Sequence, residues 1–337
     1  MAKYKPKTKD ELQELIKDKS INLGDIDVSK ITEMSYLFKD LGRVDFSGIE
    51  KWNVSNVTDM SSMFNGCYTF NQPLEKWDVS NVTDMSGMFY GCYSFNQPLE
   101  KWDVSNVTKM NSMFSDCYAF NQPLEDWNVS KVVDMEGIFG RCYTFNQPLE
   151  KWDFSNVTNM YCMFCRCYTF NQSLEKWDVS SVTKMSYMFS GCYTFNQSLE
   201  KWDVSSVTKM SHMFNKCYAF NQPLEKWDVS NVTDMSFMFD NCYNFNQPLE
   251  KWDVSNVIVM ESMFEHTINF NQPLAKWAIK GKKECKFNFM FNCAKSFNQD
   301  LSSWDLSKVN KDNIEYFLDG CGIDDKFYPK GIKKNLK

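Results

Sequence analysis

Tryptophan recurs at a fixed interval along this chain. The eleven tryptophans stand at positions 52, 77, 102, 127, 152, 177, 202, 227, 252, 277 and 304, so nine of the ten intervals are 25 residues and the last is 27. The phrase from Leu74 to Met85 recurs with few changes around most of them. A period between about 20 and 50 residues is typical of a solenoid, in which each unit buries its apolar side against its neighbours. The period therefore predicts one stacked repeat protein.

Residues 74–98 illustrate one predicted unit, or rung. Leu74, Trp77 and Val79 have the spacing of a leucine-rich-repeat strand with Trp in the middle position, and the turn residues Ser80-Asn81 follow. Apolar side chains then recur at helical intervals, at positions 82, 85, 88, 89 and 92. This pattern predicts an α/β repeat solenoid of the leucine-rich-repeat type, with about 12 rungs that each contain a short parallel β-strand and a short helix.

The two ends of the chain differ from its middle. Thr8 and Glu11 form a Thr-x-x-Glu capping box before the apolar Leu12, Leu15 and Ile16, which predicts an N-terminal capping helix. The last rung loses the methionine columns, and atypical terminal units are expected in solenoids. We therefore expect a capping segment over residues 1–23, a single repeat domain over 24–321 and a C-terminal tail over 322–337.

Charge and hydropathy exclude some classes of protein. The net charge of −6 gives no support to a nucleic-acid-binding surface. No run of about 18 apolar residues is present, so no membrane span is expected. The basic segment Met1–Lys7 is followed by polar residues where the apolar core of an export signal would lie.

The chain has 13 cysteines, which is an odd number. Eight recur in register, where a buried thiol serves as a small hydrophobe, at positions 67, 92, 117, 142, 167, 192, 217 and 242. Such a pattern favours a reducing compartment over a disulfide framework. Cys162 and Cys165 are additional and form a C-x-x-C pair beside Cys167, which leaves a thiol or zinc site at Cys162/Cys165 as an alternative function.

Residues that recur in every rung belong to the scaffold, so a catalytic site should break the repeat. No Ser-His-Asp set, H-E-x-x-H motif or glycine-rich phosphate loop is present. His212 and His266 are the only histidines, and their variable positions are interpreted as solvated surface. Four lysines lie where one rung gains two residues, and we interpret them as a solvated loop, with a small-anion contact as the alternative: Lys280, Lys282, Lys283 and Lys286. We expect no enzyme activity, no cofactor and no metal.

The surface columns differ in how much they vary. Lys76, Asp78 and their equivalents repeat almost unchanged on the predicted sheet face, and we expect them to pair laterally. Two columns on the other side vary from rung to rung. One places the aromatic residues Tyr187, His212 and Phe237 in consecutive rungs, and aromatic side chains dominate binding hot spots. We predict partner contacts at these three residues together with Tyr90 and Asp240 of the second column; the alternative is drift on a tolerant surface.

The phrase over residues 77–99, Trp-Asp-Val-Ser-Asn-Val-Thr-Asp-Met-Ser-x-Met-Phe followed by Cys and Phe-Asn-Gln-Pro-Leu, resembles the BspA-like leucine-rich-repeat surface proteins with 25-residue repeats. The resemblance covers about residues 24 to 321. It implies a non-enzymatic, surface-located or secreted protein of a host-associated microbe that adheres to a host surface or matrix protein. The missing export signal and the cysteine pattern favour the alternative of an intracellular scaffold or effector, so both locations stay open.

Overall fold

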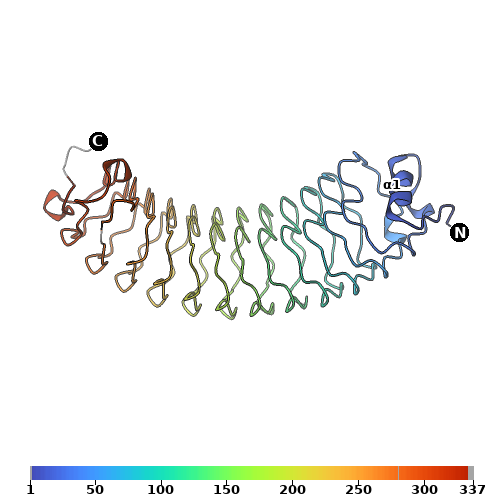
Figure 1. Cartoon of the computed structure of the whole chain (residues 1–337), viewed down its shortest axis with the longest axis horizontal. Helices are drawn as coiled ribbons and strands as arrows, with labels where there is room; N and C mark the ends of the chain where they lie inside the picture. The colour runs from blue at the N-terminus through green and yellow to red at the C-terminus, as the bar shows by residue number, and fades with distance from the viewer. Residues whose placement is uncertain (1, 280, 333–337) are drawn as a thin grey trace. The chain divides into compact units, whose positions relative to one another are not determined.

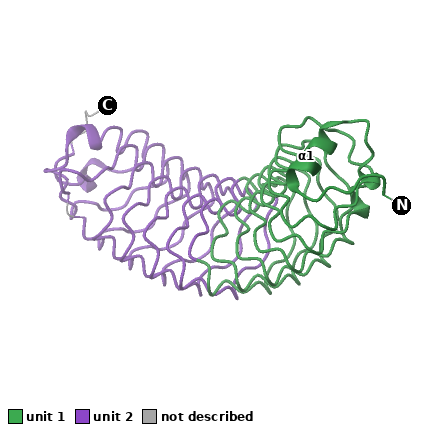
Figure 2. Ribbon diagram, turned by 45° about the vertical axis from the view of Figure 1, so that its right-hand side comes forward, with its two compact units in different colours: residues 1–157, 166–168 green, residues 158–165, 169–337 purple. Residues whose placement is uncertain are grey.

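The computed structural model describes residues 2–279 and 281–332 (Figure 1), and the chain forms two compact units (Figure 2). Unit 1 contains the described residues up to Val157 together with Arg166–Tyr168; unit 2 contains Thr158–Cys165 and the described residues from Thr169 onward. Within each unit the chain winds in successive coils, one coil or rung for each sequence repeat (Figure 2). The predicted repeat solenoid is therefore the architecture of each unit.

The N-terminal helix α1, Lys9–Lys17, begins at the predicted capping residue. The Thr8 hydroxyl accepts a hydrogen bond from the Glu11 amide at 3.2 Å, which satisfies one of the amides left open at a helix start. Leu12 and Ile16 are fully buried and attach α1 to the first rungs. At the other end, the buried Arg43 guanidinium donates to the carbonyl of Ile16 at 3.1 Å, so a side chain from the first rungs satisfies a C-terminal carbonyl of the helix.

The remaining helical elements are single 3₁₀ turns near the two chain ends: η1 Leu23–Asp25, η2 Ile49–Lys51, η3 Lys311–Asn313 and η4 Asp325–Phe327. η1 and η2 contact each other, and Gly48 at the start of η2 has φ of 92°. A Cβ at Gly48 would lie 2.3 Å from the Gly24 nitrogen, so the contact between the two turns requires glycine. No helix among the described residues is long and apolar enough to cross a membrane.

A parallel ladder joins the rungs at one position in each repeat. In unit 1 the bridges run from Glu33 through Asp59, Asp84 and Lys109 to Asp134. In unit 2 they run from Asn159 through the equivalent residues to Val259 and Lys286. Each rung therefore hydrogen-bonds to its neighbour through the segment that the apolar spacing assigned to the helix.

Backbone amides in this segment alternate between two kinds of partner. The amides of Met85, Gly87, Phe89 and Gly91 donate to carbonyls of the next rung, at 2.8–2.9 Å. The intervening amides of residues 88, 90 and 92 donate three residues back within their own rung, at 2.9–3.1 Å. The segment is thus a chain of tight turns whose outward amides form the ladder, and it satisfies its buried backbone groups without a helix or a continuous strand.

The predicted strand at 77–79 and helix at 82–92 are therefore wrong, although the repeat itself is present. Within each rung the residues equivalent to 87 and 91 have positive φ, for example 59° at Gly87 and 73° at Gly91. An α-helix needs φ near −60° at every residue, so two left-handed residues four apart prevent it. Apolar side chains at intervals of three or four also lie on one side of a chain of turns, which is why the spacing imitated a helix.

Gly137 offers a direct test of the left-handed column. Its φ is 59°, and an added Cβ would lie 3.3 Å from Ser112 Oγ. We expect Gly137→Val to lower the free energy of unfolding by about 1–3 kcal/mol, because a β-branched residue resists left-handed backbone. Urea denaturation followed by circular dichroism measures this. Gly137→Asn is the matched control and should cost less, since Asn tolerates that conformation; equal losses for both variants would contradict the explanation.

Columns of identical side chains form the core of each unit. Trp, Val, Met, Phe and Leu at equivalent positions are buried in rung after rung. Indoles also donate across rung boundaries, as Trp127 Nε1 does to the Leu99 carbonyl at 3.0 Å. Neighbouring rings stack, for example Phe89 on Phe114 with ring centroids 5.7 Å apart. Hydrophobic burial and the indole hydrogen bonds therefore help to fix the register of the stack.

The in-register cysteines are buried, as predicted, but they also serve as hydrogen-bond donors. Cys142 Sγ lies 3.0 Å from the Phe114 carbonyl, and burial raises the pKa of the Cys142 thiol well above its usual range. Where the column changes to Thr267, the hydroxyl Oγ1 donates to the Phe239 carbonyl at 2.6 Å. From Cys67 to Thr267 the column thus combines a small side chain with a donor, whereas Ala294 occupies the equivalent buried position without one.

The surface lysines pair with a different residue from the one expected. Lys251 Nζ lies 3.1 Å from a carboxylate oxygen of Glu225, and Lys226 makes the equivalent pair with Glu200 in the preceding rung. The aspartates instead accept from their own turns, as Asp228 does from the Ser230 amide at 3.0 Å. The expected lateral Lys–Asp pairing is wrong at these rungs because the aspartate already caps the following turn.

Candidate functional site

The aromatic residues of the first variable column occupy left-handed backbone. The φ angles are 61° at Tyr187, 58° at His212 and 56° at Phe237. Elsewhere the same column has Gly or Ser in five rungs, Cys in one and aromatic residues at Tyr36, Phe289 and Tyr316; of these residue types only glycine adopts this backbone without strain. A bulky residue there costs roughly 1–2 kcal/mol, and retained strain is a reason to look for function.

The three aromatic rings, here called the aromatic strip, form one continuous stack in unit 2. The ring centroids of Tyr187 and His212 are 4.2 Å apart with an interplanar angle of 10°, and those of His212 and Phe237 are 4.4 Å apart with an angle of 17°. Tyr161 contacts the Tyr187 ring edge to face at 5.6 Å. All three strip residues are half-buried, so the stack presents partly exposed aromatic surface.

His212 is less solvated than its variable position in the sequence predicts. Burial lowers the pKa of His212 to about 4, against an opposing effect of Asp234, so the strip is neutral near pH 7. Nδ1 of His212 and Nδ1 of His266 are both buried without a hydrogen-bond partner among the described residues. The interpretation as solvated surface is wrong for His212, because its ring stacks between those of Tyr187 and Phe237, whereas the His266 side chain is 45% exposed.

Asp240 lies one turn after Phe237 and belongs to a group of polar residues from successive rungs. Its side chain is 11% exposed, and Glu265 and His266 lie beside it. Burial and the neighbouring Glu265 raise the Asp240 pKa to about 7, whereas Lys216 and the amides of Asn215 and Asn241 oppose this shift. Asp240 is therefore an acid with an unusual proton affinity in contact with the strip segment.

Tyr90, the fifth predicted contact residue, lies in unit 1, whereas the other four lie in unit 2. Its ring is 40% exposed. Burial of the hydroxyl and the nearby Asp116 carboxylate raise the pKa of Tyr90, and Asp116 also pairs with Arg141 at 3.2 Å. The structure brings Tyr187, His212, Phe237 and Asp240 into one segment of unit 2 but gives Tyr90 a different set of neighbours.

The additional cysteines occupy two different settings. Cys162 and Cys165 are half-buried in unit 2, where the Cys165 amide donates to the Cys162 carbonyl at 3.0 Å. Cys167 belongs to unit 1 and is buried, with Sγ 3.0 Å from the Phe139 carbonyl. Cys167 is therefore a core residue of the regular column, and only Cys162 and Cys165 remain as members of the alternative thiol or zinc site.

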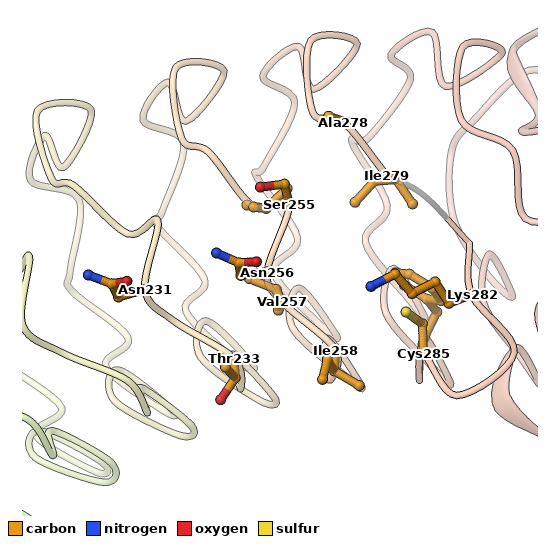
Figure 3. Close-up of a pocket in the computed structure, with 12 residues that line it drawn as sticks. Asn231, Thr233, Ser255, Asn256, Val257, Ile258, Ala278, Ile279, Lys282 and Cys285 are labelled. Atoms are coloured by element: carbon orange, nitrogen blue, oxygen red, sulfur yellow. The ribbon is translucent and has the colours of Figure 1, made fainter.

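A cavity of about 380 Å³ lies where the rung after Trp277 departs from the repeat (Figure 3). Ala278 replaces the aspartate that normally caps the turn, and Ile258 replaces the usual threonine and is 40% exposed. The Lys282 side chain extends from the irregular rung toward Asn256 (Figure 3), and no described residue forms an ion pair with it. Of the four basic residues, Lys282, Lys283 and Lys286 are exposed, and Lys280 lies outside the described residues.

A column of stacked tyrosines was missed in the sequence analysis. In unit 1 Tyr93 stacks on Tyr118 with ring centroids 4.4 Å apart, and in unit 2 Tyr218 stacks on Tyr243 at 4.9 Å. Tyr68, Tyr93 and Tyr243 are among the exposed large hydrophobic residues. The signal in the sequence is a tyrosine directly after each in-register cysteine.

Rungs of 25 residues, joined by a backbone ladder and filled by columns of identical side chains, define a repeat scaffold protein. The chain belongs to the family described as "Mycoplasma protein of unknown function, DUF285", which matches residues 10–125, 74–177, 95–200, 138–235 and 219–321. The matches overlap and together extend over the repeats, and the family description names no catalytic activity. No curated protein matches the chain.

Three solved structures that match the chain share little sequence with it. A leucine-rich repeat protein from Bacteroides ovatus is 13% identical, with 90% of this chain and 88% of that one covered and a TM-score of 0.47. The TLR13–ssRNA13 complex is 10% identical, with 93% and 53% covered and a TM-score of 0.27. A leucine-rich repeat protein of Leptospira interrogans is 6% identical, with 96% and 95% covered and a TM-score of 0.22.

Proposed function

We propose that this protein is a non-enzymatic scaffold of the leucine-rich-repeat type that binds a protein partner through the aromatic strip and Asp240. The observation that carries the proposal is the strip itself. Three bulky rings stack in consecutive rungs at backbone positions where glycine would avoid strain. Partly exposed, rigid aromatic rings lose little side-chain entropy on binding and are typical hot-spot residues.

The finer function follows from the resemblance to BspA-like proteins. We propose adhesion to a host surface or matrix protein, with the repeats as one domain of about 12 rungs over residues 24–321. An intracellular scaffold or effector stays the alternative. The buried thiols favour the intracellular alternative, because Cys142 and its equivalents must stay reduced to serve as hydrogen-bond donors in the core. Protease treatment of intact source cells distinguishes the two, since a surface adhesin is cleaved and an intracellular scaffold is protected.

The binding surface is tested with the variant Tyr187→Ser, His212→Ser, Phe237→Ser. Serine already occupies the same left-handed column elsewhere, so the variant keeps a residue that the backbone accepts. We expect affinity for purified extracellular-matrix proteins to fall by about 30-fold or more, as for loss of a hot spot worth 2 kcal/mol or more. Surface plasmon resonance measures the affinity, and circular dichroism shows that the fold is retained.

The tyrosine column provides a matched control with the same number of aromatic rings removed. The control variant is Tyr193→Ser, Tyr218→Ser, Tyr243→Ser, which removes three stacked rings from nearby rungs of unit 2. It should bind with the affinity of the unchanged protein if the aromatic strip is the contact. If the control variant loses the partner and the strip variant keeps it, the assignment of the binding surface is wrong.

A further inference from the structure

The ladder brings two carboxylates and an imidazole together in unit 2. The Asn241 amide donates to the Glu265 carbonyl at 2.9 Å, which sets Asp240 and Asn241 beside Glu265 and His266 of the next rung. One ligand atom from each of Asp240, Glu265 and His266 lies within 4.8 Å of the other two. Asp240 and Glu265 stand in the second variable column and His266 at the position after it, so none of the three is a residue that repeats from rung to rung.

The His266 ring is oriented into this group of carboxylates. Its Nδ1 lies 3.9 Å from an Asp240 carboxylate oxygen and 3.8 Å from a Glu265 carboxylate oxygen. Both separations exceed hydrogen-bonding distance, and Nδ1 is buried without a partner among the described residues. A buried imidazole nitrogen that faces two carboxylates without bonding to either is an incompletely satisfied site.

Side-chain amides hold the two carboxylates in place. Asn215 Nδ2 and Asn241 Nδ2 each donate to Asp240 at 2.7 Å, and Asn292 Nδ2 donates to Glu265 at 2.8 Å. Carboxylates that bind metals are usually fixed by such outer hydrogen bonds. Lys216 is the cation that acts on Asp240, and its effect on the Asp240 pKa is smaller than those of burial and of Glu265. The group therefore retains two closely spaced carboxylates.

We propose that Asp240, Glu265 and His266 bind one divalent transition-metal ion of the zinc type. One imidazole and two carboxylates suit such an ion better than Mg²⁺ or Ca²⁺, which prefer oxygen ligands alone. Ligand bonds of about 2.0–2.2 Å place ligand atoms about 3.3–3.6 Å apart in a tetrahedron, so the distances of 3.9 and 3.8 Å from His266 Nδ1 to the two carboxylates shorten by a few tenths of an ångström on binding. The His266 side chain is 45% exposed and can make this adjustment. A fourth position remains for water or for a partner's side chain.

Zinc binding by the full chain tests the proposal. Equilibrium dialysis with Zn²⁺ in the presence of a non-chelating reductant should give one bound ion in the unchanged protein and in the Cys162→Ser, Cys165→Ser variant. His266→Gln should weaken that binding by at least about tenfold in both backgrounds. The chain has two histidines, so its proton NMR spectrum has two imidazole signals, and Zn²⁺ should move the His266 signal alone.

His212→Gln is the matched control, because His212 also has a buried Nδ1 without a partner but lies outside the group. It should bind zinc like the unchanged protein and should identify the remaining imidazole signal as that of His266. Glu265→Gln provides a second ligand variant whose fold is checked by circular dichroism. The proposal is overturned if zinc does not bind, if binding is lost only with Cys162 and Cys165, or if His266 instead forms an imidazolium ion pair that Zn²⁺ leaves unchanged. Loss of partner affinity in the aromatic-strip variant would not affect these results.

Discussion

Replacing Trp127 with alanine is expected to lower the free energy of unfolding by about 3–5 kcal/mol. The indole is 3% exposed and stacks between Trp102 and Trp152, with ring centroids 6.5 and 6.4 Å away. Truncation leaves a cavity between two rungs and removes the donor to the Leu99 carbonyl. A solenoid rung contacts only its neighbours, so the loss cannot be spread over a larger core. Urea denaturation followed by circular dichroism measures the change.

Two further variants separate packing from hydrogen bonding at Trp127. Trp127→Phe keeps an aromatic ring in the column but removes Nε1, so it should cost about 1–3 kcal/mol for the unsatisfied Leu99 carbonyl. Tyr118→Ala removes a ring from the surface column and should cost less than Trp127→Ala. A loss below about 1 kcal/mol in Trp127→Ala would show that the tryptophan column contributes little to the stack.

The period and the terminal helix could be predicted from the sequence because each depends on a local signal. Tryptophans at intervals of 25 residues require equivalent environments, and Thr8 with Glu11 defines a helix start through its own hydrogen bonds. The contents of the rung could not be predicted in the same way. Side chains at positions 82, 85, 89 and 92 point to one side in a helix and in a chain of turns alike, so their spacing does not distinguish the two.

Backbone conformation also decided how much of the candidate site could be predicted. The stack of Tyr187, His212 and Phe237 follows from their equivalent positions in consecutive rungs, which sequence alignment of the repeats is enough to reveal. Their left-handed backbone conformation does not follow from the sequence, because aromatic residues are poor markers of positive φ. The group around Asp240 needs contacts between two adjacent columns, and a period of 25 residues aligns positions only within one column.

Removing the Asp240 carboxylate is expected to stabilise the protein at alkaline pH. Burial and Glu265 raise the Asp240 pKa from 3.8 to about 7, so between these values the folded protein binds more protons than the unfolded chain. The contribution of Asp240 to stability is therefore fully present below pH 4 and is lost as the pH rises through 7. A shift of this size corresponds to about 4 kcal/mol. At pH 8 and with a chelator present, Asp240→Asn should unfold at higher urea concentration than the unchanged protein.

The pH profile of the unchanged protein contains an opposing contribution, because the pKa of His212 is lowered from 6.5 to about 4. The contribution of His212 to the free energy of unfolding is present above pH 6.5 and is lost as the pH falls through 4. Between pH 4 and 6.5 it therefore partly cancels the contribution of Asp240, which changes with pH in the opposite direction. His212→Gln removes the pH dependence due to His212, so the stability of that variant should rise as the pH falls from 7 to 4. Asp240→Asn removes the pH dependence due to Asp240, so the stability of this variant should fall over the same interval. Parallel profiles for the two variants would mean that neither group titrates in its buried setting as the structure indicates.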